Sequence, residues 1–155
     1  MSNRPPGFEL PLRLLLAFRG LIDALHAELA RQGHPHVRPM HGFALQALAG
    51  GATAAELGRR LGVSKQAAGK TIDALERLGY VERGTDPGDA RRKVARVTDR
   101  GFDVLTRSAT VLDDLRGEWE RTLGAERLAA LEYDLRRVTP ADIWRIDVPG
   151  WFGGP

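Results

Sequence analysis

The residues from Ser64 to Thr71 combine small, amide and cationic side chains and contain no bulky apolar group. Amides and lysines can pair with base edges or phosphates in the DNA major groove, and small residues let a helix backbone approach closely. The candidate contact residues are Ser64, Lys65, Gln66, Gly69, Lys70 and Thr71. Taken alone, the pattern fits an ordinary solvent-exposed helix equally well. Whether it indicates DNA binding depends on the neighbouring secondary-structure elements.

A second cationic group follows within 25 residues. Residues 80–83 and 93–97 alternate and are rich in strand formers, while GTDPGDAR between them is a turn-rich loop. This predicts a two-stranded hairpin with a basic tip that could lie along a minor groove or a phosphate backbone. The candidates here are Asp89, Arg91, Arg92 and Lys93. A carboxylate beside a guanidinium favours a fork-like pair in which Asp89 positions Arg91.

The elements before the hairpin predict two short helices joined by a tight turn. Thr53 and Glu56 form a T-x-x-E capping box at the start of the first helix. Gly62 can adopt the positive φ that a sharp reversal requires, and Ser64 caps the second helix, which ends at Gly79. Helix, turn, helix and hairpin together have the shape of a unit that reads duplex DNA.

The remaining segments are predicted to be helical. Apolar periodicity indicates a helix over residues 9–32, another over 40–48 and a long one over 99–122. In the long helix Leu105, Leu112 and Trp119 recur every seven residues, a spacing that favours packing against a long partner helix. Gly124 separates it from a last helix with four inward-facing side chains, namely Leu128, Leu131, Leu135 and Val138.

Composition narrows the class of protein. The 155 residues suffice for one domain, alone or with extra dimerising helices, and 43% hydrophobic and 28% charged residues are typical of a globular protein. Between residues 59 and 107 there are 12 Lys or Arg against 7 Asp or Glu, which indicates nucleic-acid binding or, alternatively, a solvated basic face. With no leader sequence or membrane-spanning run, we expect a cytoplasmic, nucleoid-associated protein and no membrane partner.

Other chemistries have weaker support. The chain has no cysteine, no Gly-rich phosphate loop and no HExxH motif, so we expect no enzyme activity and no cofactor. His34, His36 and His41 fit turn and surface histidines better than a metal site. Apolar residues of the tail, among them Trp144 and Trp151, are expected to dock on the chain's own helices, on a second copy or on a separate partner.

Three stretches resemble the MarR family of winged helix–turn–helix regulators: ELGRRLGVS, LERLGYVERGTDPGDARR and VTDRG. The resemblance implies a mainly α fold with a small β-hairpin wing, and it divides the chain into a dimerisation helix (1–36), a DNA-binding domain (37–101) and C-terminal dimerisation helices with the tail (102–155). It also implies that Gln66 and Lys70 read the major groove, that Arg91 enters the minor groove and that Asp89 orients it. Ala90 departs from the family, which often has arginine there.

The same resemblance implies how the protein works. Family members are homodimers that bind double-stranded DNA at pseudo-palindromic operators, most often as repressors. Many are released by a small aromatic or phenolic ligand held between the dimer helices and the winged domain, where Arg13, His41 and Phe43 are the candidates here. The alternative is a winged-helix module that binds protein without specific DNA binding, which the cationic face formed by Lys65, Lys70 and Arg91 argues against.

Overall fold

The computed structural model describes residues 4–140, which are mainly helical with one two-stranded antiparallel sheet. In chain order the elements are α1 (Glu9–Arg31), α2 (Pro39–Leu48), α3 (Ala54–Leu61), α4 (Lys65–Arg77), β1 (Val81–Asp86), β2 (Asp89–Val97), α5 (Asp99–Leu123) and α6 (Ala125–Val138). The predicted class, mainly α with a small β-hairpin, is therefore confirmed. The apolar tail lies outside the described residues.

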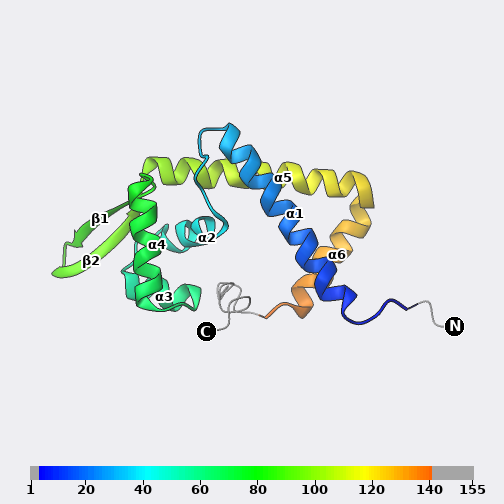
Figure 1. Cartoon of the computed structure of the whole chain (residues 1–155), viewed down its shortest axis with the longest axis horizontal. Coiled ribbons are helices and arrows are strands. Elements are labelled where there is room, and N and C mark those ends of the chain that lie inside the picture. The colour runs from blue at the N-terminus through cyan, green and yellow to red at the C-terminus, as the bar shows by residue number, and fades with distance from the viewer. Residues whose placement is uncertain (1–3, 141–155) are drawn as a thin grey trace.

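The long helix α5 connects two parts of the molecule (Figure 1). A unit made of α2, α3, α4 and the β1–β2 hairpin lies at one end of α5, and α6 with the N-terminal part of α1 lies at the other. The helix α1 packs across α5 between them. None of the helices in residues 4–140 combines the length and the apolar character needed to cross a membrane.

The predicted caps begin and end the helices of the winged unit. Thr53 Oγ1 accepts from the backbone N–H of Glu56 at 3.2 Å, and Glu56 accepts from the backbone N–H of Thr53 at 2.8 Å, which completes the capping box. Ser64 caps α4 by accepting from the N–H of Ala67 at 3.0 Å. Gly62, at φ 72°, makes the reversal between α3 and α4, so the predicted helix–turn–helix is confirmed.

The core lies where these helices meet α1 and α5. Its largest fully buried side chains come from the first four helices, the residue before β1 and the first half of α5: Leu29, Leu45, Leu48, Leu57, Leu61, Ile72, Leu75, Tyr80 and Val104. The first four helices supply most of them, because the 3.6-residue period gathers apolar side chains on one face. Val138 was expected to face inward, but its side chain is 78% exposed at the last residue of α6, so that expectation is wrong.

The hairpin is longer than the alternating residues indicated. The expected loop over residues 84–91 is mostly strand, and only Pro87 and Gly88 connect β1 to β2. Asp86 opposes Asp89, whereas Thr85 opposes Lys93, so residues 90–92 have no partner on β1 and form a bulge. Bulges re-aim side chains near functional sites. The predicted basic tip is therefore a bulge on β2 beside a two-residue turn.

Candidate nucleic-acid interface

The N-terminal half of α4 presents a polar, exposed surface. Lys65, Gln66 and Lys70 are exposed, and an added Cβ on Gly69 would meet no atom within 4 Å. Two other predicted contact residues also have roles within the fold, because Ser64 caps the helix and Thr71 Oγ1 donates to the backbone oxygen of Ala67 at 3.2 Å. The structure thus brings the six candidates onto one helix start, with two of their hydroxyl groups hydrogen-bonded to the backbone.

The turn before α4 depends on a close backbone approach. A Cβ added to Gly58 in α3 would lie 2.8 Å from the backbone oxygen of Val63 and 3.2 Å from that of Ser64. Since real Cβ atoms essentially never approach so closely, only glycine allows the chain leaving α3 to turn tightly into α4. Gly58 therefore sets the angle at which α4 leaves the turn, and with it the direction of the exposed lysines.

Asp89 does not make the predicted fork with Arg91. Its carboxylate accepts from the backbone N–H of Arg91 at 3.0 Å, and among residues 4–140 no ion pair joins the two side chains. An Asp side chain often accepts from the backbone N–H two residues further on, as in an Asx turn. Asp89 thus shapes the backbone of the bulge and leaves the exposed Arg91 guanidinium available to a ligand.

Arg92 is held within the fold. Its guanidinium pairs with Glu56 at the start of α3 and lies 3.4 Å from the Asp86 carboxylate on β1. The N–H of Thr53 and then the charge of Arg92 keep the pKa of Glu56 below its usual range, so this carboxylate stays charged at neutral pH. The pair with Glu56 fixes the wing against α3. The contact of Arg92 with DNA remains a prediction.

A second ion pair holds the wing against α4, and sequence reasoning missed it. Arg83 on β1 lies 2.6 Å from Asp73 and 2.8 Å from Glu76, both on α4. The pair with Asp73 and then that with Glu76 raise the pKa of Arg83 above its already high ordinary value. The sequence did hold a signal for this ion pair: two carboxylates three residues apart on one helix face, followed by an arginine on the next strand. Their effect is to orient the hairpin relative to α4.

Four of the predicted contact cations have no such partners among residues 4–140 and lie on α4 and the wing. Within the described range no ion pair involves Lys65, Lys70, Arg91 or Lys93, and all four side chains are exposed. By contrast, Arg83 and Arg92 are neutralised by carboxylates of the same unit. The site therefore offers positive charge at the start of α4 and along β2, the two places where a duplex could meet it.

The three expected ligand residues do not line one cavity. Phe43 lines an apolar pocket of about 80 Å³ between α1, α2 and α5. Arg13 lies in the exposed first half of α1, where it pairs with Glu9 at 3.0 Å. His41 faces a different cavity, between α2 and α4. Within one chain the side chains of α2 point to different neighbours, since Phe43 turns toward α1 and α5 and His41 toward α4. Their contact with a ligand remains a prediction.

His34 is buried rather than on the surface as expected, and His41 is nearly so, at 2% and 8% exposure. His34 Nδ1 lies 2.8 Å from the Tyr80 hydroxyl and its Nε2 lies 2.8 Å from Asp103. Arg107 and then His34 hold the pKa of Asp103 below its usual range, and burial raises the pKa of Tyr80. The loop after α1, the base of β1 and the start of α5 are thereby tied together.

Geometry places the chain among the winged helix–turn–helix proteins: a capped α3, a glycine turn, α4 and a hairpin that two ion pairs hold in place. A family model described as "MarR family" matches residues 39–92, the segment from the start of α2 to the bulge in β2. Over this segment the chain is therefore similar to the MarR family. This family consists of transcriptional regulators and not of enzymes, in agreement with the expectation from the motifs.

Individual relatives agree with this assignment. The chain is 33% identical over 89 residues to the multiple antibiotic resistance protein MarR of Escherichia coli, covering 57% of this chain and 62% of that one. It is 48% identical over 46 residues to YcgE of Bacillus subtilis, an uncharacterised HTH-type transcriptional regulator, covering 30% of each chain. The chain thus matches less than two thirds of the length of either curated relative.

A solved structure extends the similarity over most of the chain. The crystal structure of a mutant E. coli MarR complexed with operator DNA is 25% identical, with a TM-score of 0.67 over 85% of this chain and 94% of that one. The similarity covers more than the winged unit, since a match of this extent includes most of the described helices.

Proposed function

We propose that the protein is a DNA-binding transcriptional regulator that acts as a homodimer on a pseudo-palindromic operator, most simply as a cytoplasmic repressor. The observation that carries the proposal is the exposed start of α4, where Lys65, Gln66 and Lys70 project from a helix held by its own caps and not by these side chains. A similar protein, E. coli MarR, has been solved with operator DNA.

In the proposed complex α4 enters the major groove. Gln66 presents an amide that suits adenine, and Lys65 and Lys70 present ammonium groups that suit guanine or phosphate. Gly69 supports this placement because it leaves open space where the helix would come closest to the duplex. The cap at Ser64 leaves the other backbone N–H groups of the first turn directed outward, where they favour a phosphate.

The wing would reach the neighbouring minor groove. Arg91 sits on the bulge of β2, exposed and without an ion pair among residues 4–140, so its charge is available to the negative potential of that groove. Lys93, farther down the strand, would meet the phosphate backbone. The ion pairs of Arg83 and Arg92 support this arrangement because they fix the distance between wing and α4 before DNA arrives.

A homodimer is proposed from the apolar surface of α1. Seven large apolar side chains in or next to its first half are exposed by 41% or more: Phe8, Leu10, Leu12, Leu14, Leu15, Leu16 and Phe18. A monomer in water rarely exposes so many large apolar side chains on one segment, and a second copy would cover them. Two-fold symmetry would then place two α4 helices on half-sites roughly 10 bp apart, one helical turn of DNA.

Release by a small aromatic or phenolic effector belongs to the same proposal. Its support is the apolar pocket between α1, α2 and α5, where Phe43 and Leu29 supply contact surface and His26 and Ser108 supply polar groups. The pocket holds about 80 Å³, well below the roughly 300–1,000 Å³ of typical ligand sites. An effector would therefore have to separate α1 from α2, which would move the winged unit relative to the dimer helices.

The test is a binding titration with DNA from upstream of the protein's own coding region, beside scrambled duplex, at several salt concentrations. A preference of roughly a thousandfold or more would establish a specific regulator. Arg91→Ala should then cost roughly 1–3 kcal/mol of binding free energy, and Lys70→Ala should lower the salt slope by about one unit if it contacts phosphate.

The matched control is Arg127→Ala, which removes one exposed arginine from α6, far from the winged unit. It should leave the affinity unchanged, with dimer mass checked by light scattering. Binding that is equal on both duplexes would reduce the proposal to a non-specific basic surface. No binding to either would favour a protein-interaction module instead, and an unchanged affinity for Arg91→Ala would show that the wing assignment is wrong.

A further inference from the structure

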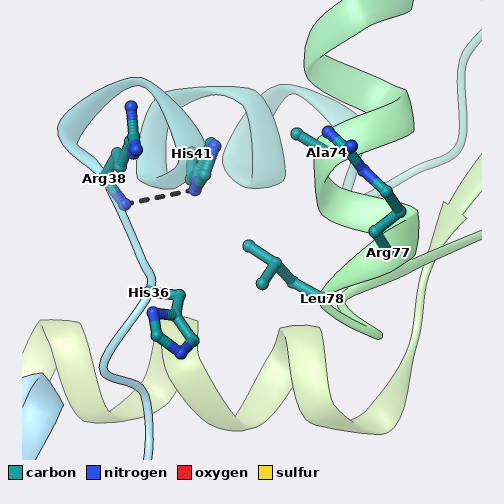
Figure 2. Close-up of a pocket in the computed structure, with 6 residues that line it drawn as sticks. All are labelled: His36, Arg38, His41, Ala74, Arg77 and Leu78. Atoms are coloured by element: carbon teal, nitrogen blue, oxygen red, sulfur yellow. Dashed lines mark hydrogen bonds between the residues drawn. The ribbon is translucent and has the colours of Figure 1, made fainter.

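A second cavity lies on the other side of α2 from the apolar pocket. It has a volume of about 330 Å³ and is lined by His36, Arg38, His41, Ala74, Arg77 and Leu78. Figure 2 shows that these residues come from three elements: His36 from the connection after α1, Arg38 and His41 from the start of α2, and the other three from the last turns of α4 and its end. The cavity therefore spans the junction between α4 and the loop that leads to α1.

Among the residues that the structure describes, the lining of this cavity carries positive charge and no carboxylate. Within the described range neither Arg38 nor Arg77 takes part in an ion pair or a side-chain hydrogen bond, whereas Arg83 nearby has two carboxylates. Asp73 and Glu76 line a separate pocket together with Arg77, and both are paired with Arg83. Two arginines on different elements thus line a cavity where no carboxylate among residues 4–140 forms an ion pair with them.

His41 adds a neutral donor to these two cations. Its Nδ1 accepts the backbone N–H of Arg38 at 3.1 Å, which leaves the ring proton on Nε2. Burial, and then the charges of Arg38 and His26, lower the pKa of His41, so the ring is neutral at pH 7. A neutral imidazole with its proton on Nε2 donates a hydrogen bond, and His36, exposed at the rim, can supply another.

We propose that this cavity binds a small organic oxyanion, a carboxylate or a phosphate ester, that bridges Arg38 and Arg77. Guanidinium groups bind carboxylate and phosphate oxygens through paired, charge-assisted hydrogen bonds, the strongest kind that the lining offers. Ala74 and Leu78 give an apolar wall for the carbon part of the ligand. The volume is at the lower end of the range for small-molecule sites, which suits a metabolite rather than a larger ligand.

Such a ligand would connect α4 directly to the loop between α1 and α2. Because α4 carries the exposed lysines, the bound anion would favour one orientation of α4 relative to the dimer helices, and this consequence rests on the proposed DNA-binding function. Linkage requires that if the anion changes the affinity for DNA, DNA changes the affinity for the anion by the same factor. Binding of the anion itself needs no DNA.

The experiment uses the four histidine rings of the full-length protein as reporters, without DNA. Their ring resonances are followed by NMR during titration with citrate and, separately, with glucose 6-phosphate, against sodium chloride at equal ionic strength. His36 and His41 line the cavity, whereas His34 is buried in a different hydrogen-bond network and serves as the internal control. We expect saturable shifts of His36 and His41 with at least one anion and none of comparable size at His34.

Three variants decide the result. Arg38→Gln and Arg77→Gln should each weaken anion binding roughly tenfold or more, because each removes a charged hydrogen-bonding partner. The control Arg127→Gln removes an equally exposed arginine from α6 and should not change it. A response to citrate alone identifies a carboxylate site, and a response to glucose 6-phosphate alone identifies a phosphate site. A response to both identifies a site that recognises negative charge without distinguishing the two groups.

Non-saturable shifts with both anions would overturn the proposal, and so would shifts that persist unchanged in Arg38→Gln and Arg77→Gln. A final titration repeats the operator binding with and without the anion that binds. If the anion binds but DNA does not, the cavity stands and the proposed function fails. If DNA binds but neither anion does, the proposed function stands and the proposed anion site fails.

Discussion

The contact between the start of α5 and Tyr80 yields the sharpest prediction about stability. A Cβ added at Gly101 would lie 2.3 Å from the backbone oxygen of Tyr80 and 2.5 Å from Val97 Cγ1. The Tyr80 oxygen cannot yield easily, because it accepts from the backbone N–H of Thr98 at 3.0 Å, beside the cap of α5. Gly101→Ala therefore has to move α5 away from the base of the wing by roughly 1 Å.

Overpacking of this kind costs roughly 1–3 kcal/mol, partly offset by up to about 1 kcal/mol from the higher helix propensity of alanine. We expect a net loss of roughly 1–2 kcal/mol in the free energy of unfolding. The assay is urea unfolding followed by far-UV circular dichroism, at one fixed protein concentration because a dimer's stability depends on concentration.

The matched control is Gly69→Ala in α4, where an added Cβ meets nothing within 4 Å. This variant should be as stable as the wild type or up to about 1 kcal/mol more stable. A Gly101→Ala protein at least as stable as the wild type would refute the close approach of α5 to Tyr80, and with it the account of how the wing is held. Destabilisation of both variants by equal amounts would refute the steric reasoning.

Two further predictions concern charge. Glu56→Gln keeps an acceptor for the N–H of Thr53 but removes the carboxylate that neutralises Arg92. The free energy of unfolding should change by less than about 1 kcal/mol, while the affinity for the operator should rise. An affinity that stays level or falls would show that Arg92 does not reach DNA. The pKa of His41 is lowered in the folded state, so below its ordinary value of 6.5 the unfolded chain binds a proton that the folded chain excludes, and stability should fall as pH falls. Urea unfolding at pH 7.5, 6.5 and 5.5 should show a steeper loss for the wild type than for His41→Gln, and equal slopes would contradict the assignment.

The parts of the fold that follow from neighbouring residues were predictable. Thr53 and Ser64 each cap a helix that begins as expected, because a cap acts within three residues of itself. Gly124 likewise ends α5 at the expected place. These signals located the helix–turn–helix and hence the exposed face of α4.

Contacts between distant residues were not predictable in the same way. His34 finds its partners Tyr80 and Asp103 at separations of 46 and 69 residues, and no periodicity in the sequence reports such a meeting. The same reason explains why His41 and Phe43 line different cavities of the chain: knowing which face of a helix is apolar does not say which neighbour that face will meet.

The arginines show why local charge alone cannot define a nucleic-acid interface. Arg83, Arg91 and Arg92 lie within ten residues and look equivalent in the sequence. In the fold, Arg83 is neutralised by α4 and Arg92 by the start of α3, while the guanidinium of Arg91 has no carboxylate beside it among residues 4–140. A cation already paired within the protein adds little to counterion release, so the salt dependence of DNA binding should reflect Arg91 and the lysines rather than the full basic block. The paired arginines contribute by holding the wing in position before DNA is bound.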